Sequence, residues 1–284
     1  MKQKFIEENY EIVDFEDKAD IYVVNTCTVT NMSDRKSRQI IRRAKEKNPK
    51  SILVVTGCYA QVAKEELSKI EDIDSVIGNQ EKKDIISYIK DHEKEKQEHI
   101  SDILYEKEFA EFGTTVYTDK TRAVIKVQDG CDRFCSYCII PYARGRIRSR
   151  KPEEVVLEIE EIAKKGIKEV VITGIHLASY GRECTHKLSL LDLLKQINEI
   201  HGIERIRLEE LVKLSKICNH FHLSLQSGCN ETLARMNRKY TVEEFEKGIK
   251  LIRKNYPDVS LTTDIIVGFP GETEEEFEKT YEFL

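Results

Sequence analysis

The hydrophobic and polar positions of the first hundred residues follow two alternating patterns. Residues 19–25 (ADIYVVN) and 51–56 (SILVVT) are short apolar runs rich in β-branched side chains, which is typical of buried strands. Residues 35–47, which are strongly basic, and residues 62–70 show the spacing of helices. Strands that alternate with helices predict a parallel sheet with helices on its faces.

A second series of strands and helices follows. Strands are expected at about residues 123–128, 169–173, 205–208, 221–225 and 261–267, and helices at 152–165, 188–200 and 242–255. Five such steps without a hairpin signal favour a parallel (β/α) barrel or part of one. The sequence stops at Leu284 inside another helical pattern, so we expect at least one barrel strand to be missing.

A mixed-charge stretch at residues 90–111 separates the two series and predicts a solvated helix or a linker. A chain of 284 residues favours two domains, at about 150 residues each. We therefore expect an α/β chain with an N-terminal parallel sheet domain, residues 1–114, and a partial (β/α) barrel, residues 115–284.

Composition limits the possible partners. The formal charge of −5 excludes a polybasic nucleic-acid binder, so any such surface must be a local patch. No apolar run is long enough to span a membrane, and the N-terminal residues do not form a signal peptide. We expect a cytoplasmic protein whose eight cysteines stay reduced, which directs attention to metal binding or catalysis.

Three cysteines lie within eight residues, directly after the first strand of the second series. They are Cys131, Cys135 and Cys138, in a CxxxCxxC arrangement. Three thiolates on one loop can hold three irons of a [4Fe–4S] cubane, leaving the fourth iron open. Structural zinc would need four ligands, and no fourth Cys or His lies at matching spacing. Burial as a core element is disfavoured because polar residues flank the thiols.

With these cysteines, several motifs resemble the methylthiotransferases of the radical S-adenosylmethionine (SAM) superfamily. They are NTCTVTN at 25–31, TGCYAQ at 56–61, CSYCIIPYARGRIRSR at 135–150, ITGIHLASYG at 172–181 and DIIVGFPGET at 264–273. The segment HFHLSLQSGCNETLARMNRKYT at 220–241 is most similar to the subgroup that acts on threonylcarbamoyladenosine beside the tRNA anticodon.

The resemblance implies that the open iron on the Cys131, Cys135 and Cys138 cluster binds SAM, whose reductive cleavage gives a radical that attacks an unreactive adenine carbon. It also implies a SAM pocket lined by residues at strand ends, namely Gly174, Gln226, Ser227 and Asp264. Turn glycines, caps or polar loop residues would explain the same four positions. The implied partners are tRNA and an electron-donor protein, and we expect neither a membrane nor DNA as a partner.

Cys27 and Cys58 each follow a predicted parallel strand, so both should emerge at one edge of the first sheet. Alone, they would be typical of buried structural thiols. The resemblance instead implies a second, auxiliary cluster held by three cysteines from three loops. The first of these has no counterpart here, because the sequence begins in what resembles the helix after the family's opening strand. We expect a weakly held auxiliary cluster, and either a misassigned start or a fragment.

Two further departures from the family pattern are expected. Only about a dozen residues separate the strands that end near 208 and start near 221, which is the lower limit for a parallel crossover. The small β-barrel with which the family grips tRNA has no counterpart at the C-terminal end. Cys184, Cys218 and Cys229 match no ligand role and are interpreted as packing or surface thiols.

Arginine recurs at every second position in one segment, at Arg144, Arg146, Arg148 and Arg150, and Lys151 follows. In an extended segment this period places all four guanidinium groups on one face. Arginine suits phosphate because its planar fork donates two parallel hydrogen bonds, so the strip is a candidate tRNA contact. A solvated loop or salt bridges would explain the same pattern.

The first functional hypothesis is a tRNA methylthiotransferase that adds a methylthio group to C2 of N6-threonylcarbamoyladenosine. A second keeps the chemistry but changes the target, to isopentenyladenosine in tRNA or to a ribosomal protein. A third is an inactive fragment that serves only as a metal-binding or RNA-binding module. No catalytic side chain is identified from the sequence.

Overall fold

The computed structural model describes residues 1–28, 30–91, 96–110, 122–184, 189–207 and 220–284. The chain divides into two compact units. The first comprises Met1–Val116 together with Ile139–Arg146, and the second comprises Tyr117–Cys138 and Ile147–Leu284. The predicted domain boundary near residue 115 lies outside the described residues.

The first unit is built on a four-stranded parallel sheet in the order β1-β2-β3-β4. Strands β1 (Ile21–Thr26) and β2 (Ile52–Gly57) confirm the two predicted strands. Strand β3 (Ser75–Ile77) was not predicted. Strand β4 (Gln97–His99) corrects the expectation of a helix or linker there, because its backbone pairs with β3.

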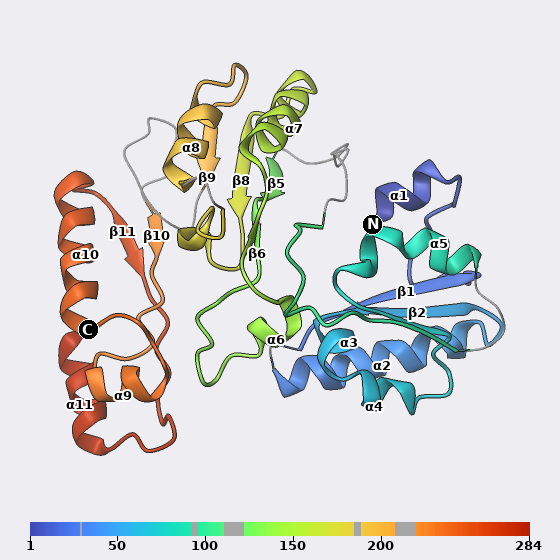
Figure 1. Cartoon of the computed structure of the whole chain (residues 1–284), viewed down its shortest axis with the longest axis horizontal. Coiled ribbons are helices and arrows are strands. Elements are labelled where there is room, and N and C mark those ends of the chain that lie inside the picture. The colour runs from blue at the N-terminus through green and yellow to red at the C-terminus, as the bar shows by residue number, and fades with distance from the viewer. Residues whose placement is uncertain (29, 92–95, 111–121, 185–188, 208–219) are drawn as a thin grey trace. The chain divides into compact units, whose positions relative to one another are not determined.

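Alternate strand residues of this sheet enter two different cores. Leu53 and Val55 pack in one core with side chains of α2 (Asn31–Lys47), α3 (Cys58–Val62) and α4 (Lys64–Ser68). Val54 enters the other core, with side chains of α1 (Lys2–Glu7) and α5 (Ile85–Lys90). The sheet is therefore covered on both faces, as Figure 1 shows. A single helix at 62–70 is wrong, because Ala63 leaves the helical region, with φ −117° and ψ 36°, between α3 and α4.

The second unit contains a parallel sheet in the order β5-β8-β9, formed by Arg122–Lys126, Glu169–Thr173 and Arg205–Arg207. Strands β10 (His220–His222) and β11 (Ser260–Thr262) form a second parallel pair, and an isolated bridge joins Gln226 to Ile265. The short predicted crossover between 208 and 221 lies almost entirely outside the described residues.

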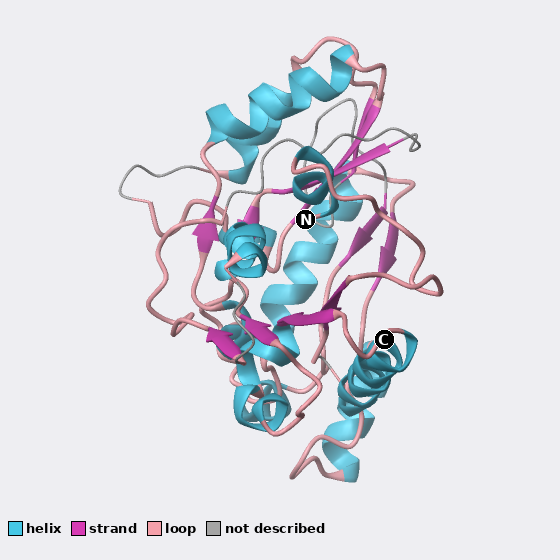
Figure 2. Cartoon of the chain, turned by 90° about the vertical axis from the view of Figure 1, so that its right-hand side faces the viewer, coloured by secondary structure: helices cyan, strands magenta, loops and turns pink. Residues whose placement is uncertain are grey.

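Helices accompany these strands as the hydrophobic pattern predicts. Helices α7 (Pro152–Lys164) and α8 (Leu190–Asn198) contribute side chains to the same core as β5, β8 and β9. Helix α10 (Val242–Asn255) has the predicted bounds. Figure 1 labels these helices, and Figure 2 shows the helices and strands of the chain in a second view. The second unit also contains α9 (Asn230–Arg235) and α11 (Glu274–Phe283). The α/β fold with parallel strands in both units is confirmed.

One short antiparallel pair of strands, which the sequence analysis did not predict, accompanies the parallel sheets. Strand β6 (Gln128–Asp129) pairs with β7 (Arg148–Ser149). Helix α6 (Ile140–Arg144) lies between them in sequence and belongs to the first unit. The chain therefore leaves the second unit after Cys138 and returns to it at Ile147.

Candidate cluster and cofactor site

The CxxxCxxC loop is held against the segment 235–240 of the same unit. The Ser136 amide donates to the Met236 carbonyl at 3.1 Å, and the Asn237 side chain donates to the Phe134 carbonyl at 2.8 Å. Phe134 has a φ of 48°, a left-handed conformation that is uncommon for a residue other than glycine. The backbone around Cys135 is therefore fixed from outside the loop.

Arg238 places a positive charge beside one of the three thiols. Its guanidinium donates to Cys135 Sγ at 3.5 Å and to the Ser224 carbonyl at 3.0 Å. It also lies 4.8 Å from the centre of the Tyr240 ring, within cation–π range. Burial alone would lower the pKa of Arg238. The hydrogen bond to Cys135 and the neighbouring Tyr240 outweigh this effect and raise the pKa above its ordinary value, so the guanidinium stays charged. Sequence reasoning missed this residue, although it lies in the quoted segment 220–241.

A small cavity opens beside this loop. It is lined by Arg133, Cys135, His176, Asn237, Arg238, Lys239 and Tyr240, so its lining carries three cations and no carboxylate. Burial, together with the charges of three nearby arginines, lowers the pKa of His176 to about 4. The imidazole is therefore neutral at pH 7. Such a lining suits a ligand that carries a carboxylate.

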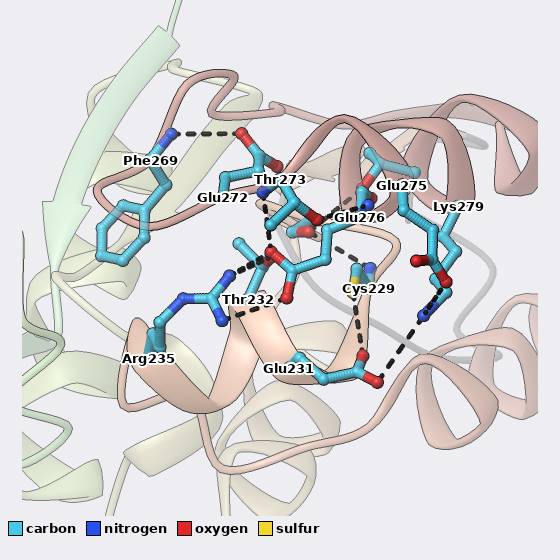
Figure 3. A network of polar contacts seen from close by, with 12 residues as sticks. Cys229, Glu231, Thr232, Arg235, Phe269, Glu272, Thr273, Glu275, Glu276 and Lys279 are labelled. Atoms are coloured by element: carbon cyan, nitrogen blue, oxygen red, sulfur yellow. Dashed lines mark hydrogen bonds and ion pairs between the residues drawn. The ribbon is translucent and has the colours of Figure 1, made fainter.

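A polar network fixes the segment that holds the cysteine loop (Figure 3). Arg235 forms an ion pair with Glu276 of α11, and its Nη1 donates to Glu276 Oε1 at 3.0 Å. Thr273 caps α11 in a capping box with the same glutamate. The Arg235 carbonyl in turn accepts from the Ser136 hydroxyl at 3.0 Å. Helix α11 thus contributes to the position of the loop through Arg235.

The three thiols fit a cluster by their chemistry. None is in a disulfide, Cys135 is buried, and burial raises the pKa of the Cys131 thiol, with the Cys135 and Cys138 thiols adding to the effect. Throughout the described ranges, no three Cys, His, Asp or Glu side chains already form a closed metal-ligand set. The donor set is thus three soft sulfurs on one loop next to a cation, which matches three corners of an iron–sulfur cubane.

None of the four predicted SAM residues lines this cavity. Gly174 lies next to it: an added Cβ would approach Gln128 Oε1 to 2.9 Å, and this oxygen accepts from the His176 amide. Gln226 is buried with φ 72°. Ser227 is fully buried, and its hydroxyl contacts Thr280 of α11 and accepts from the Cys229 amide, so it has a structural role.

Asp264 lies at the exposed end of the β10–β11 pair. Its carboxylate is 3.2 Å from His222 Nε2, and its carbonyl accepts from the Gln226 amide at 2.9 Å. Its side chain is 71% exposed, so it remains available to a ligand.

Cys27 and Cys58 lie at the same edge of the first sheet, as the sequence predicts. Thr26 pairs with Gly57 in the parallel β1–β2 register, and each cysteine is the next residue. Cys27 is exposed and Cys58 is buried. Arg144 Nε donates to Cys58 Sγ at 3.1 Å.

The predicted arginine strip is wrong as a single extended face. Arg144 is the last residue of helix α6 and contacts Cys58. Arg148 is 2% exposed, with Asp129 at 3.8 Å, and Arg150 is 9% exposed and donates to Glu158 at 2.6 Å. Only Arg146 of the four is exposed. Two of these arginines are therefore buried beside carboxylates of their own unit.

Three cysteines were interpreted from the sequence as packing or surface thiols, and two of them lie among the described residues. Cys229 is buried and donates to Glu231 at 2.9 Å (Figure 3), and Cys184 is partly buried. Cys218 lies outside the described residues.

Comparison with known proteins places these features in a family context. Residues 125–284 match the radical SAM superfamily, and residues 1–78 match the uncharacterized protein family UPF0004. The chain is 48% identical over its whole length to a threonylcarbamoyladenosine tRNA methylthiotransferase (MtaB) from Aquifex aeolicus, covering 72% of that protein. The corresponding protein from Bacillus subtilis is 44% identical over 99% of the chain, which covers 66% of it.

The chain is also similar to less closely related proteins. A tRNA-2-methylthio-N(6)-dimethylallyladenosine synthase from Clostridium novyi is 36% identical over 95% of the chain and 64% of its own length. The chain thus spans about two thirds of these curated relatives. Among solved structures, the radical SAM methyltransferase TsrM from Kitasatospora setae has a TM-score of 0.64 at 17% identity, covering 99% of the chain and 62% of TsrM, which supports the fold.

Proposed function

Because the chain belongs to the radical SAM superfamily and, within it, to the threonylcarbamoyladenosine tRNA methylthiotransferases, we propose that it adds a methylthio group to C2 of N6-threonylcarbamoyladenosine beside the anticodon of tRNA. The observation that carries the proposal is the CxxxCxxC loop, docked beside a carboxylate-free cavity with three cations. In this proposal the partners are tRNA and an electron-donor protein, and the protein acts in the cytoplasm. No described helix is both long and apolar enough to cross a bilayer.

Each side chain of the site has a distinct task in this proposal. Cys131, Cys135 and Cys138 hold the [4Fe–4S] cluster, which together with SAM supplies the radical chemistry when bound. Arg238 balances the negative charge of the ligated Cys135 sulfur. Arg133 and Lys239 line the cavity as cations and attract the carboxylate of SAM. Gly174 leaves room for the Gln128 side chain, whose Oε1 accepts from the His176 amide and holds that residue at the cavity.

The edge of the first sheet supplies a second set of ligands. Cys27 and Cys58 emerge side by side from β1 and β2, and we assign them to an auxiliary cluster involved in sulfur transfer. Arg144 donates to Cys58 and is therefore a neighbour of this cluster rather than a contact to tRNA phosphate.

Nucleoside analysis of cellular tRNA tests the function directly. Deleting the gene should remove 2-methylthio-N6-threonylcarbamoyladenosine and leave the unmodified N6-threonylcarbamoyladenosine in its place. Loss of the isopentenyladenosine derivative instead would assign the second target, and an unchanged tRNA profile would contradict the proposal.

Substitution of single cysteines separates the two clusters. We expect Cys135→Ala to abolish reductive cleavage of SAM to deoxyadenosine, because the loop then offers only two thiolates. Cys58→Ala should leave this cleavage intact and reduce only methylthio transfer. Anaerobically reconstituted protein should bind about four irons firmly per chain, and about eight if the auxiliary cluster also assembles. Equal loss of SAM cleavage in both variants would contradict this division of roles.

A further inference from the structure

Helix α2 presents a continuous exposed face to solvent. Its buried side, with Ser37, Ile41 and Ala44, packs against the sheet. The opposite side repeats at intervals of three and four residues, which places its members in one row along the helix. This outer face of α2 consists of Met32, Arg35, Lys36, Gln39, Arg42, Arg43 and Glu46, all of them exposed.

The charge of this outer face is almost entirely positive and largely unpaired. Arg43 bonds to Glu16 at 2.7 Å. Arg35, Lys36 and Arg42 form no ion pair or side-chain hydrogen bond with any residue that the structure describes. Glu46, near the C-terminal end, is the only acid of the face. Three cations without an ion pair among the described residues thus lie within two turns of one helix, although the chain as a whole has a formal charge of −5.

The face is hollowed at the end that lies nearest to the cysteine edge of the sheet. Met32, Ser33, Arg35, Lys36 and Gln39 line a shallow groove. The chain enters α2 from β1 through Cys27, with Thr30 as the N-cap, so the groove begins a few residues after that cysteine. A polyanion bound along α2 would therefore reach the edge that carries Cys27 and Cys58.

The position of the apolar residues distinguishes between classes of anionic partner. A helix that binds a membrane inserts its apolar side among lipids, but in α2 Ile41 and Ala44 are completely buried in the core. Arginine and lysine spaced along one exposed row instead match the regular phosphates of a nucleic-acid backbone.

We propose that the outer face of α2 binds the sugar-phosphate backbone of the RNA substrate and directs it toward the edge with Cys27 and Cys58. The inference rests on the proposed function for the identity of the polyanion. It replaces the predicted arginine strip, which is divided between the two units, with a surface of the first unit. Phosphate contacts position RNA without reading its bases, so the face should bind different tRNAs alike.

Salt-dependent binding of a fluorescently labelled tRNA transcript tests the proposal in cluster-free protein. Each phosphate contact contributes about −0.7 to −0.9 to the slope of log affinity against log salt concentration. The triple variant Arg35→Gln, Lys36→Gln, Arg42→Gln should therefore reduce the magnitude of the slope by roughly 2 to 2.7. A matched variant, Lys50→Gln, Lys69→Gln, Lys83→Gln, removes three exposed charges elsewhere in the same unit and should leave the slope nearly unchanged.

Three results would overturn the proposal. The first is an unchanged salt slope of tRNA binding in the α2 variant, and the second is an equal change of this slope in both variants. The third is an α2 variant that binds tRNA as before but no longer binds an acidic electron-donor protein. Unfolding midpoints of all three proteins check that the folds are intact. Because the measurement needs neither cluster nor SAM, a positive result stands even if the nucleoside analysis assigns another modification.

Discussion

Arg146 and Arg150 show how strongly the surroundings decide what one kind of side chain does. Arg146 is exposed, whereas Arg150 lies in the interior opposite the buried Glu158. A buried charge that keeps its partner is tolerated, but one that loses it pays the cost of desolvation without compensation. The backbone carbonyl of Arg150 also accepts from the Tyr180 hydroxyl at 2.7 Å, so this position is fixed in two ways.

Removing one partner of this pair should therefore destabilise the protein. We expect Arg150→Ala to lower the free energy of unfolding by roughly 3–5 kcal/mol, because Glu158 is left charged in the interior. The double variant Arg150→Met, Glu158→Leu should recover most of this loss, and Arg146→Gln should change stability by less than about 0.5 kcal/mol. Urea unfolding measures all three, and a loss in the double variant as large as in Arg150→Ala would contradict the explanation.

His176 should make stability depend on pH in the acidic range. Its pKa is lowered from 6.5 to about 4 in the folded protein, chiefly by burial, so the unfolded chain binds more protons between these values. Stability should therefore be unaffected by this residue above pH 6.5 and should fall as the pH drops toward 4, by about 3 kcal/mol at most.

Urea unfolding of cluster-free protein at pH 7.5 and pH 5 tests this dependence. The substitution His176→Asn removes the titrating group and should flatten that part of the pH profile. Identical profiles for the two proteins would show that the imidazole is not held neutral by burial.

Among the secondary-structure elements, the turn between β2 and α3 determines where Cys58 begins its helix. Gly57 has a φ of 106°, and an added Cβ would lie 2.2 Å from the Thr26 carbonyl oxygen on the neighbouring strand. Both the backbone conformation and the close approach of β1 require glycine. The same turn brings Cys58 next to Cys27.

Comparison of two glycines separates these two requirements. Gly57→Ala should lower the free energy of unfolding by roughly 2–4 kcal/mol, because strain and a backbone clash add. Gly166 has a similar φ of 83° but no atom within 4 Å of its added Cβ, so Gly166→Ala should cost only about 1–2 kcal/mol. Equal losses in thermal or urea unfolding would show that the clash with Thr26 contributes nothing.

Strands and long helices could be predicted where the pattern is local. The helix at 242–255 follows from its amphipathic spacing, and the strands before Cys27 and Cys58 follow from their β-branched runs. Helix α6 was missed because the alternating arginines suggested an extended chain. A local signal existed, since Pro141 lies in the first turn and Gly145, with φ 76°, ends the helix.

Across the whole molecule, the predictable part of the site was the part contained in one loop. The CxxxCxxC spacing identifies Cys131, Cys135 and Cys138 without any knowledge of the fold. The contact between Arg238 and Cys135 could not be predicted in the same way. The two residues are about a hundred positions apart and meet only because the fold packs the cysteine loop against segment 235–240. The burial of Arg150 likewise depends on the packing of α7, which carries Glu158.

The return of helix α6 to the first unit bears on how this architecture can be inherited. A unit made of two separate stretches of sequence cannot be exchanged by one recombination event, because any single crossover between genes would separate α6 from the sheet or the cysteine loop from its barrel. Ala143 in α6 is completely buried, so a hybrid protein would expose an apolar surface at the break. We therefore expect the two units to be inherited together as one gene.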